Sequence, residues 1–409
     1  MKNIFKNIGP GPLIAAAFIG PGTVTVCTLS GVQFGFALLW AMVVSVIATL
    51  VLQEMTARLG LATQKGLSEV IRHEIKHPVL KYAAIVLVLS AIVVGNAAYE
   101  GGNISGGVLG LETLFGASAF TIGSFKINSF SFLIGGIAFV LLYLGNYKVL
   151  ERTLIGLVVL MSIAFLTTAI LTKPDILALL KGSFVPSFPN GSTLLVIALI
   201  GTTVVPYNLF LHAALVQEKW KNIKDLKYAR KDTFVAIALG GLVSMSIIIS
   251  ASAIQIDSIT NVADLALGLQ PLFGDFSTYF LAVGLFAAGI TSAITAPLAA
   301  AYVASGCFGW HSNLKSKRFR AVWMFILIVG VVLSSSGFKP IEIIKFAQIA
   351  NGVLLPVIAG FLVWVMNRKT LLGVYKNNSL QNSFGLLIFL MSLLLALFAI
   401  QNVFNLNIL

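Results

Sequence analysis

The architecture follows from two short stretches, Phe18-Ile19-Gly20-Pro21-Gly22-Thr23 and Gly201-Thr202-Thr203-Val204-Val205-Pro206-Tyr207-Asn208. Each stretch places proline and glycine inside a long apolar segment. Proline removes a backbone hydrogen-bond donor and clashes with the preceding turn, and glycine adopts conformations that other residues do not. The sequence therefore predicts two interrupted helices, with breaks at Pro21, Gly22 and Pro206.

The composition indicates that lipid surrounds these segments. The 409 residues are 58% hydrophobic and 10% charged, with a mean hydropathy of +0.97. An average soluble domain carries about 25% charged residues, so this chain could not cover a water-facing surface. We predict an all-α integral membrane protein. Cys27 and Cys307 are too few for a disulfide scaffold or a thiol-rich metal site and are interpreted as structural thiols.

Hydropathy and turn signals predict eleven transmembrane helices. They are expected at 11–34, 38–58, 81–109, 129–146, 152–172, 192–216, 233–254, 277–306, 320–336, 341–366 and 383–403. We expect one transmembrane domain over 1–409, built from two repeats at about 11–172 and 192–366. Residues 367–409 then supply an extra C-terminal helix.

The net charge of +13 reflects topology rather than nucleic-acid binding. Basic residues gather in alternate loops, beginning with Lys2 and Lys6 and densest between Lys219 and Lys231. The positive-inside rule makes these loops cytoplasmic. We therefore expect a multi-pass protein of the cytoplasmic (inner) membrane, with a cytoplasmic amino terminus and an extracytoplasmic carboxyl terminus. Membrane lipid is the expected partner, and neither nucleic acid nor an obligate protein partner is expected.

The positions of the two breaks indicate a solute site. The first and sixth helices begin successive sets of five, and because five is odd the second set is inverted in the membrane. Breaks in corresponding positions of two such repeats are typical of the central site of a transporter. The alternative is that Pro21 and Pro206 merely kink packed helices.

Longer stretches resemble a known family. GPGPLIAAAFIGPGT in the first helix, VVPYNLFLHAALVQ in the sixth, AAGITSAITAPLAAAYVASG in the eighth and AQIANGVLLPV in the tenth are similar to the NRAMP family of proton-coupled divalent-metal transporters. The resemblance covers nearly the whole chain and keeps its order and spacing. It implies a LeuT-like inverted repeat of 5+5 helices, with helices 1 and 6 unwound mid-membrane and alternating access to the central site.

The departures from the family fall at its metal ligands. The family has Asp-Pro-Gly-Asn where this chain has Gly20-Pro21-Gly22-Thr23, and Met-Pro-His where it has Val205-Pro206-Tyr207. The resemblance thus implies that Gly20, Thr23 and Val205 replace three ligand side chains. A dehydrated divalent ion near the bilayer centre needs an anionic ligand, so a tight manganese or iron site is not expected. The backbone carbonyls of Gly20 and Thr202 remain candidate ligands.

Glu100 is the acidic residue placed deepest in a helix near the expected site. The resemblance aligns it with an aspartate on the family's proton route, and aligns Asn103 with a glutamate. An intramembrane carboxylate is a functional candidate by default, so Glu100 is expected to carry protons or to bind the cation. The alternative is a protonated or hydrogen-bonded glutamate that holds helices together.

Other polar residues are candidates for the same pathway. His212 matches a family histidine and could relay protons, or could be an interhelical contact. Gln348 and Asn351 match pathway-lining positions and could bind solute or hold helices together. Tyr207 replaces a second family histidine, and together with Asn103 this predicts weak or absent proton coupling.

Several classes of protein and site are excluded. No nucleophile–base pair, two-carboxylate site or histidine-rich cluster has catalytic spacing, so an enzyme is not expected. The chain has no nucleotide-binding loop, and no cofactor is expected. His73 and His77 are interpreted as solvated surface, and Glu54 as a structural or gating partner of Arg58.

The sequence thus predicts a secondary active transporter, a symporter by resemblance, that moves a cation. Two alternatives stay open. The solute could be a small organic or zwitterionic molecule, with its carboxylate at a half-helix amino terminus near Gly22 or Pro206. The scaffold could also serve as a sensor that does not transport.

Overall fold

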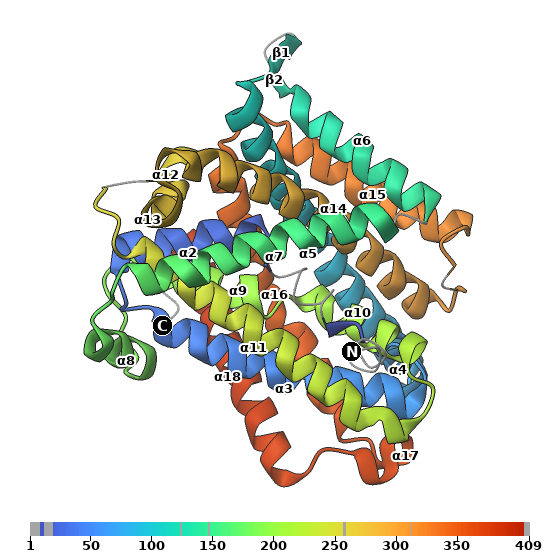
Figure 1. Cartoon of the computed structure of the whole chain (residues 1–409). Helices are drawn as coiled ribbons and strands as arrows, with labels where there is room; N and C mark the ends of the chain where they lie inside the picture. Colours follow the sequence, from blue (N-terminus) through green and yellow to red (C-terminus); the bar gives the residue numbers. More distant parts are fainter. Residues whose placement is uncertain are drawn as a thin grey trace.

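The computed structural model describes residues 9–11, 19–122, 125–145, 148–256, 259–311 and 313–404. These residues form a bundle of long helices with short helices and one small hairpin at its ends (Figure 1). The longest helices are α3 (Leu39–Thr63), α5 (Pro78–Phe115), α7 (Lys148–Leu171), α11 (Leu226–Ala251), α14 (Ser277–Phe308), α16 (Pro340–Met366) and α18 (Ser379–Phe404). The shorter helices of the bundle are α2 (Pro21–Phe34), α6 (Ser129–Leu144), α9 (Thr193–Thr203), α10 (Pro206–Lys219) and α15 (Lys317–Ser334).

Connecting segments carry the remaining elements. They are the helices α4 (Leu67–Glu74), α8 (Ile176–Phe184), α12 (Val262–Ala266), α13 (Gln270–Phe273) and α17 (Lys369–Leu372), the 3₁₀ turns η2 (Ile223–Asp225), η3 (Leu267–Leu269), η4 (Gly274–Phe276) and η5 (Gly373–Tyr375), and the strands β1 (Ala119–Ile122) and β2 (Phe125–Asn128). Figure 1 shows α4 and α17 at one end of the bundle and α8, α12, α13 and the hairpin toward the other. We call the end with α4 and α17 the basic side, because the lysine-rich segment 219–231 also lies there.

Eight helical stretches in the described part of the chain are long and apolar enough to cross a membrane. The protein is therefore a multi-pass membrane protein. Three predicted spans are not among the eight. α2 has 14 residues and α6 has 16, and α15 carries Lys317, Arg318 and Arg320 in its first turn. Residues 12–18 of the first predicted span lie outside the described residues.

Helix ends differ from the predicted bounds where helices leave the apolar region. The helix predicted at 81–109 runs from Pro78 to Phe115, and the one predicted at 38–58 runs on to Thr63. Proline at the first helical position starts α5, and Gly116, with φ 85°, ends it. Hydropathy locates the apolar part of a helix, whereas its ends depend on such caps.

The β1–β2 hairpin is an addition to the predicted all-α fold. Its strands pair antiparallel, with Ala119 opposite Asn128. Phe120, Thr121, Ile122, Phe125 and Ile127 are aromatic or β-branched residues, which favour extended backbone. The hairpin lies in a connection and leaves the helical bundle unchanged.

α5 lies at the centre of one group of helices in the bundle. It contacts α2, α10, α14, α15 and α16. Small residues allow close approach between these helices: a Cβ on Gly289 of α14 would lie 2.8 Å from the Cα of Gly107, and one on Gly110 would overlap the Ala282 carbonyl. In the rest of the bundle, α11 packs against α2, α3 and α7.

Candidate functional site

The sixth predicted helix is broken in two. α9 ends at Thr203, Val204 (φ −91°, ψ 69°) and Val205 (φ −74°, ψ 117°) leave the helical conformation, and α10 begins at Pro206. In a continuous helix the Thr202 carbonyl would accept from the amide four residues on. That residue is Pro206, which has no N–H. The break therefore leaves the Thr202 carbonyl without its helical partner.

In the first predicted span the described helix starts at the proline. α2 begins at Pro21, and Gly20 before it is extended (φ −106°, ψ −174°). The Gly20 carbonyl accepts from the Val24 amide at 3.2 Å, so only its second lone pair is open to a ligand. By contrast, Pro297 and Pro356 lie inside the continuous helices α14 and α16. Proline alone thus does not break a helix in this fold.

The two breaks meet at a hydrogen bond. The Oγ1 atoms of Thr23 and Thr202 are 2.8 Å apart, and both side chains are buried. Gln348 of α16 lies against both breaks: a Cβ on Gly22 would overlap its side-chain amide, and a Cβ on Gly201 would overlap its backbone carbonyl. α2, α9 and α16 therefore converge on one point.

Unpartnered polar atoms lie on α16 and near the start of α10. Within the described residues, no hydrogen-bond partner is found for Gln348 Oε1, Asn351 Nδ2 or Asn208 Oδ1, and each side chain is 1% exposed. A buried polar atom left unpaired costs about 1–3 kcal/mol. Natural proteins keep such groups chiefly where a ligand, water or ion meets them.

The aromatic pair Tyr99 and Tyr207 joins α5 to α10 directly after the second break. Their ring centroids are 5.4 Å apart in an edge-to-face arrangement. Val205 is buried within the break at 1% exposure. Of the predicted site residues, the structure brings Thr23, Thr202 and Gln348 together, and Val205 and Tyr207 belong to the second break and the start of α10.

Glu100 lies on a different face of α5. It is fully buried, Oε2 accepts from Asn103 Nδ2 at 3.3 Å, and Oε1 has no partner among the described residues. Its methylene groups pack against Gly330 of α15. Successive helical residues point about 100° apart, so Glu100 faces α15 whereas Tyr99 faces α10. Among the described residues no hydrogen bond joins Glu100 to Gly20 or Thr202, and its role with a cation stays a prediction.

His212 links three helices on the far side of α10. Its Nδ1 lies 2.6 Å from Gln53 Oε1 of α3, and its Nε2 lies 3.5 Å from Thr233 Oγ1 of α11. These contacts fit the interhelical alternative, and its role as a proton relay stays a prediction.

Two sets of polar contacts were not foreseen. The Thr203 hydroxyl lies 3.4 Å from Met42 Sδ of α3, which places a thioether beside the second break. Ser334 of α15 contacts the hydroxyls of Ser105 at 3.1 Å and Ser131 at 3.0 Å. Neither set has a sequence signal, because its members come from distant helices. In the described part of the chain, no three His, Cys, Asp or Glu side chains gather as a metal site would require.

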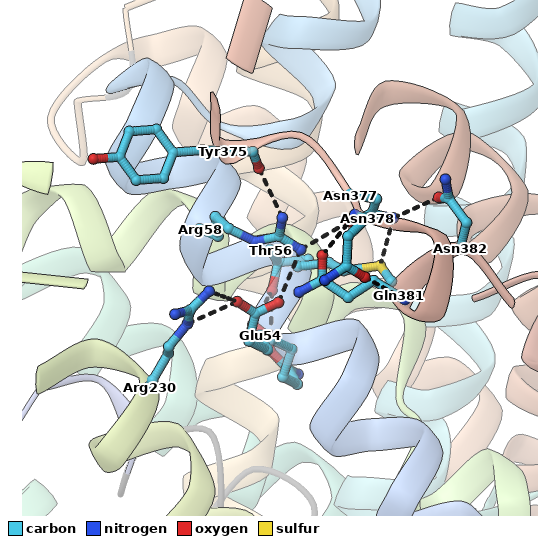
Figure 2. A network of polar contacts seen from close by, with 11 residues as sticks. Glu54, Thr56, Arg58, Arg230, Tyr375, Asn377, Asn378, Gln381 and Asn382 are labelled. Carbon is cyan, nitrogen blue, oxygen red and sulfur yellow. Dashed lines mark hydrogen bonds and ion pairs between the residues drawn. The ribbon is translucent and has the colours of Figure 1, made fainter. Parts of the chain in front are cut away.

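The predicted pair of Glu54 and Arg58 is part of a larger network (Figure 2). Arg58, 2% exposed, donates to Glu54 Oε2 at 3.0 Å, to Asn377 Oδ1 at 2.8 Å and to the Tyr375 carbonyl at 2.7 Å. Arg230 of α11 pairs with the other Glu54 oxygen at 2.8 Å. The network joins α3, α11 and the segment before α18. His73 and His77 are exposed, as expected for a solvated surface. Cys27 and Cys307 are free and buried, as expected for structural thiols.

A many-helix membrane bundle in which a broken helix contacts the start of α2 is typical of the LeuT-like fold. Solved structures agree with this fold. A crystal structure of the Eremococcus coleocola manganese transporter in complex with an aromatic bis-isothiourea compound matches with a TM-score of 0.76 and 21% identity, over 98% of this chain and 87% of that one. Mhp1, a nucleobase-cation-symport-1 family transporter, matches with a TM-score of 0.58 and 14% identity, over 96% of this chain and 92% of that one.

This chain belongs to the Nramp family. The family model described as natural resistance-associated macrophage protein-like matches residues 11–401. The divalent metal cation transporter MntH of Bacillus subtilis is 28% identical over 384 residues, which are 91% of this chain and 86% of that protein. The MntH of Klebsiella pneumoniae is 28% identical over 372 residues, 88% of this chain and 86% of that protein. The protein is therefore a member of a transporter family and not an enzyme, as predicted.

Proposed function

We propose that this protein is a secondary active transporter that carries a divalent metal cation across the membrane by alternating access. The single observation that carries the proposal is the contact of Thr23 with Thr202, which brings the two helix breaks together. Membership of the Nramp family and similarity to MntH proteins support the cation as substrate.

The proposed topology has eleven spans in the cytoplasmic membrane. Residues 11–172 and 192–366 form two inverted repeats of five helices, and the remaining C-terminal residues add one more. The amino terminus is cytoplasmic and the carboxyl terminus extracytoplasmic, because the basic side then faces the cytoplasm. Gathering of α4, α17 and segment 219–231 at one end of the bundle supports this orientation.

The proposed site binds its cation mainly with neutral oxygen atoms. The candidates are the Thr202 carbonyl, the hydroxyls of Thr23 and Thr202, and the amide of Gln348, with Gly20, Val205, Tyr207 and Asn351 lining the remainder. Oxygen ligands suit hard cations, whereas a thioether favours softer transition metals. Because Gly20, Thr23 and Val205 carry no carboxylate and the described residues hold no cluster of acidic side chains, we expect weak binding of manganese.

Uptake of radioactive manganese into proteoliposomes tests this function. We expect uptake above protein-free vesicles, and a loss of most of it in Thr23→Val, which keeps the side-chain shape and removes the hydroxyl. Thr49→Val is the matched control, because the buried Thr49 hydroxyl donates to the Ser45 carbonyl within α3. Equal uptake by both variants would refute the site, and no uptake by the wild-type protein would refute the cation.

An organic or zwitterionic solute is the second candidate. α2 and α10 both begin at the site, and helix amino termini favour a carboxylate. Tyr99 and Tyr207 supply an aromatic wall beside them. Uptake of amino acids that is independent of metal would select this candidate. Binding of metal or amino acid without any flux would indicate a sensor instead.

A further inference from the structure

The connection between α14 and α15 carries positive charge that nothing nearby in the sequence balances. Lys315, Lys317, Arg318 and Arg320 follow one another closely, and the chain has no aspartate or glutamate from Phe276 to Ile341. In the described part of the chain, none of these four side chains takes part in an ion pair. A group of like charges without counter-charges attracts an anionic partner.

Three of these side chains are available to such a partner. Lys315, Lys317 and Arg318 are exposed. Arg320, by contrast, is held within the protein: its Nη2 donates to the Tyr143 carbonyl at 3.2 Å, and its guanidinium group lies 4.1 Å from the centroid of the Tyr143 ring. The available charge is therefore that of two ammonium groups and one guanidinium group.

Two aromatic side chains lie beside these cations. α14 ends at Phe308, whose side chain is 51% exposed and stacks on Trp310 with ring centroids 4.6 Å apart. The Arg318 guanidinium group lies 5.5 Å from the centroid of the Trp310 ring. Aromatic rings next to lysine and arginine are typical of the membrane–water interface, where the rings meet the upper acyl chains and the cations meet the headgroups.

The cations and the rings lie where the chain leaves the apolar region. The apolar stretch that contains α14 ends at Phe308. α15 begins at Lys317, and its first buried apolar residue is Phe319. Side chains between these two phenylalanines are therefore at the level of the lipid headgroups. We call Phe308, Trp310, Lys315, Lys317 and Arg318 the α14–α15 patch.

A further guanidinium group lies behind the patch. A Cβ on Gly309, the residue before Trp310, would overlap the guanidinium group of Arg72 of α4. Arg72 Nε has no hydrogen-bond partner among the described residues. Arg72 therefore adds positive charge at the turn that joins Phe308 to Trp310.

The lysine-rich segment 219–231 differs from the patch. Its basic residues alternate with acids, because Glu218, Asp225 and Asp232 lie within or beside it. Arg230 also pairs with Glu54 at 2.8 Å. The protein itself partly balances the charge of this segment, whereas the charge of the α14–α15 patch is left for a partner.

We propose that the α14–α15 patch binds the headgroup of an anionic phospholipid. The phosphate oxygens accept hydrogen bonds from Lys315, Lys317 and Arg318, and the planar guanidinium group suits phosphate especially well. Phe308 and Trp310 contact the glycerol and the upper acyl chains. The bound lipid bridges the end of α14 and the start of α15, away from the helix breaks.

Thermal unfolding of the purified full-length protein in a neutral detergent tests the site. We expect phosphatidylglycerol to raise the melting temperature, and phosphatidylcholine with the same acyl chains to leave it unchanged. The double variant Lys317→Gln/Arg318→Gln should need about tenfold more phosphatidylglycerol for the same rise, because each basic residue near the membrane surface adds to the attraction. An equal rise with both lipids, or a double variant that responds like the wild type, would overturn the site.

Lys221→Gln/Lys224→Gln is the matched control. Both lysines are exposed, and the variant removes the same charge from the same side of the molecule. It should respond to phosphatidylglycerol like the wild-type protein. Equal weakening in the two double variants would mean that lipid is attracted to the whole basic side, and would overturn a distinct site.

Quenching of tryptophan fluorescence tests the position of the lipid separately. Phosphatidylglycerol with brominated acyl chains should quench the wild-type protein more than brominated phosphatidylcholine does. Trp310→Phe should abolish this difference, whereas Trp323→Phe, which removes a fully buried ring of α15, should keep it. A difference that survives in Trp310→Phe contradicts the proposed position, even if the lysine and arginine variants do not fold.

Inorganic phosphate distinguishes a lipid from a soluble anion. Because the aromatic rings contact the body of the lipid, phosphate at the same concentration should neither raise the melting temperature nor displace phosphatidylglycerol. Phosphate that replaces the lipid would overturn the lipid as the occupant. None of these measurements needs a transported solute, so their outcome is independent of the proposed function.

Discussion

Two hydroxyl groups join the helix breaks. Thr23 and Thr202 are 179 residues apart in the chain, and their Oγ1 atoms are 2.8 Å apart in the folded protein. Around them, Gly22 and Gly201 have no side chains, so Gln348 approaches both breaks. The site thus combines small residues that admit close packing with oxygen atoms that can contact a solute.

Removing this hydrogen bond is expected to show energetic coupling. Thr23→Val and Thr202→Val should each lower the free energy of unfolding by about 1–2 kcal/mol. The double variant should lose less than the sum of the two, with a coupling energy of about 1 kcal/mol. Denaturant unfolding in detergent measures all three variants. Additive losses would mean that the hydroxyls do not interact.

Glu100→Gln separates the functional role of this residue from a structural one. Glutamine keeps the shape and the contact with Asn103 but removes the charge. If the carboxylate serves the cation pathway, manganese uptake should fall about tenfold or more, equivalent to ~1.4 kcal/mol in the barrier. Unchanged uptake with a lower melting temperature would identify Glu100 as an interhelical contact only.

At the scale of elements, α16 is the wall that both breaks share. Its backbone carbonyl at Gln348 lies against α9, and its side chain at the same position lies against α2. Gly102 of α5 faces Ala347 of α16. α16 therefore contacts α9, α2 and α5 within about one helical turn.

Gly201→Ala should be strongly destabilising, because its Cβ would overlap the Gln348 carbonyl, a backbone atom that cannot rotate away. Overpacking of this kind costs about 1–3 kcal/mol or more. Gly136→Ala in α6 is the control, since its Cβ would meet nothing within 4 Å. It should leave stability unchanged or raise it by up to about 1 kcal/mol. Thermal unfolding in detergent distinguishes them, and similar shifts for both would contradict the packing argument.

Much of the element structure could be predicted from the sequence, because proline, glycine and hydropathy act locally. The break before Pro206, the start of α2 at Pro21 and the middle of most helices are examples. The contacts of the site could not be predicted so directly. Met42 beside Thr203, and Gln348 against Gly22, depend on how distant helices pack. Pro297 shows the limit of the local rule, because it lies in a helix that stays continuous.

At the scale of the whole molecule, the network in Figure 2 connects distant parts of the chain. Arg58 and Asn377 are 319 residues apart in the chain, and Arg58 Nη2 donates a hydrogen bond to Asn377 Oδ1 at 2.8 Å. Through Glu54 and Arg230 the same network reaches α11. It therefore holds α3 and α11 to the segment that precedes α18.

Arg58→Met should destabilise the protein far more than Arg230→Met. Arg58 is 2% exposed and bonds three partners, so its removal should cost about 3 kcal/mol or more. The Arg230 side chain is 49% exposed, and its loss should cost about 0–1 kcal/mol because solvent screens its charge. Melting temperatures of the two variants test the order. A larger loss for Arg230→Met would show that the contact with α11 dominates.

The length of α5 has a mechanical consequence. Its 38 residues span about 57 Å, whereas the hydrocarbon layer is about 30 Å thick. It contacts α2, α6, α10, α14, α15 and α16, six other helices of the bundle, and carries Tyr99 near its middle. A pivot of about ten degrees at Tyr99 would displace the two tips of this stiff rod by about 4 Å and about 5.5 Å. A small rotation of α5 at the candidate site would therefore become a shift wider than an ion at both ends of this helix.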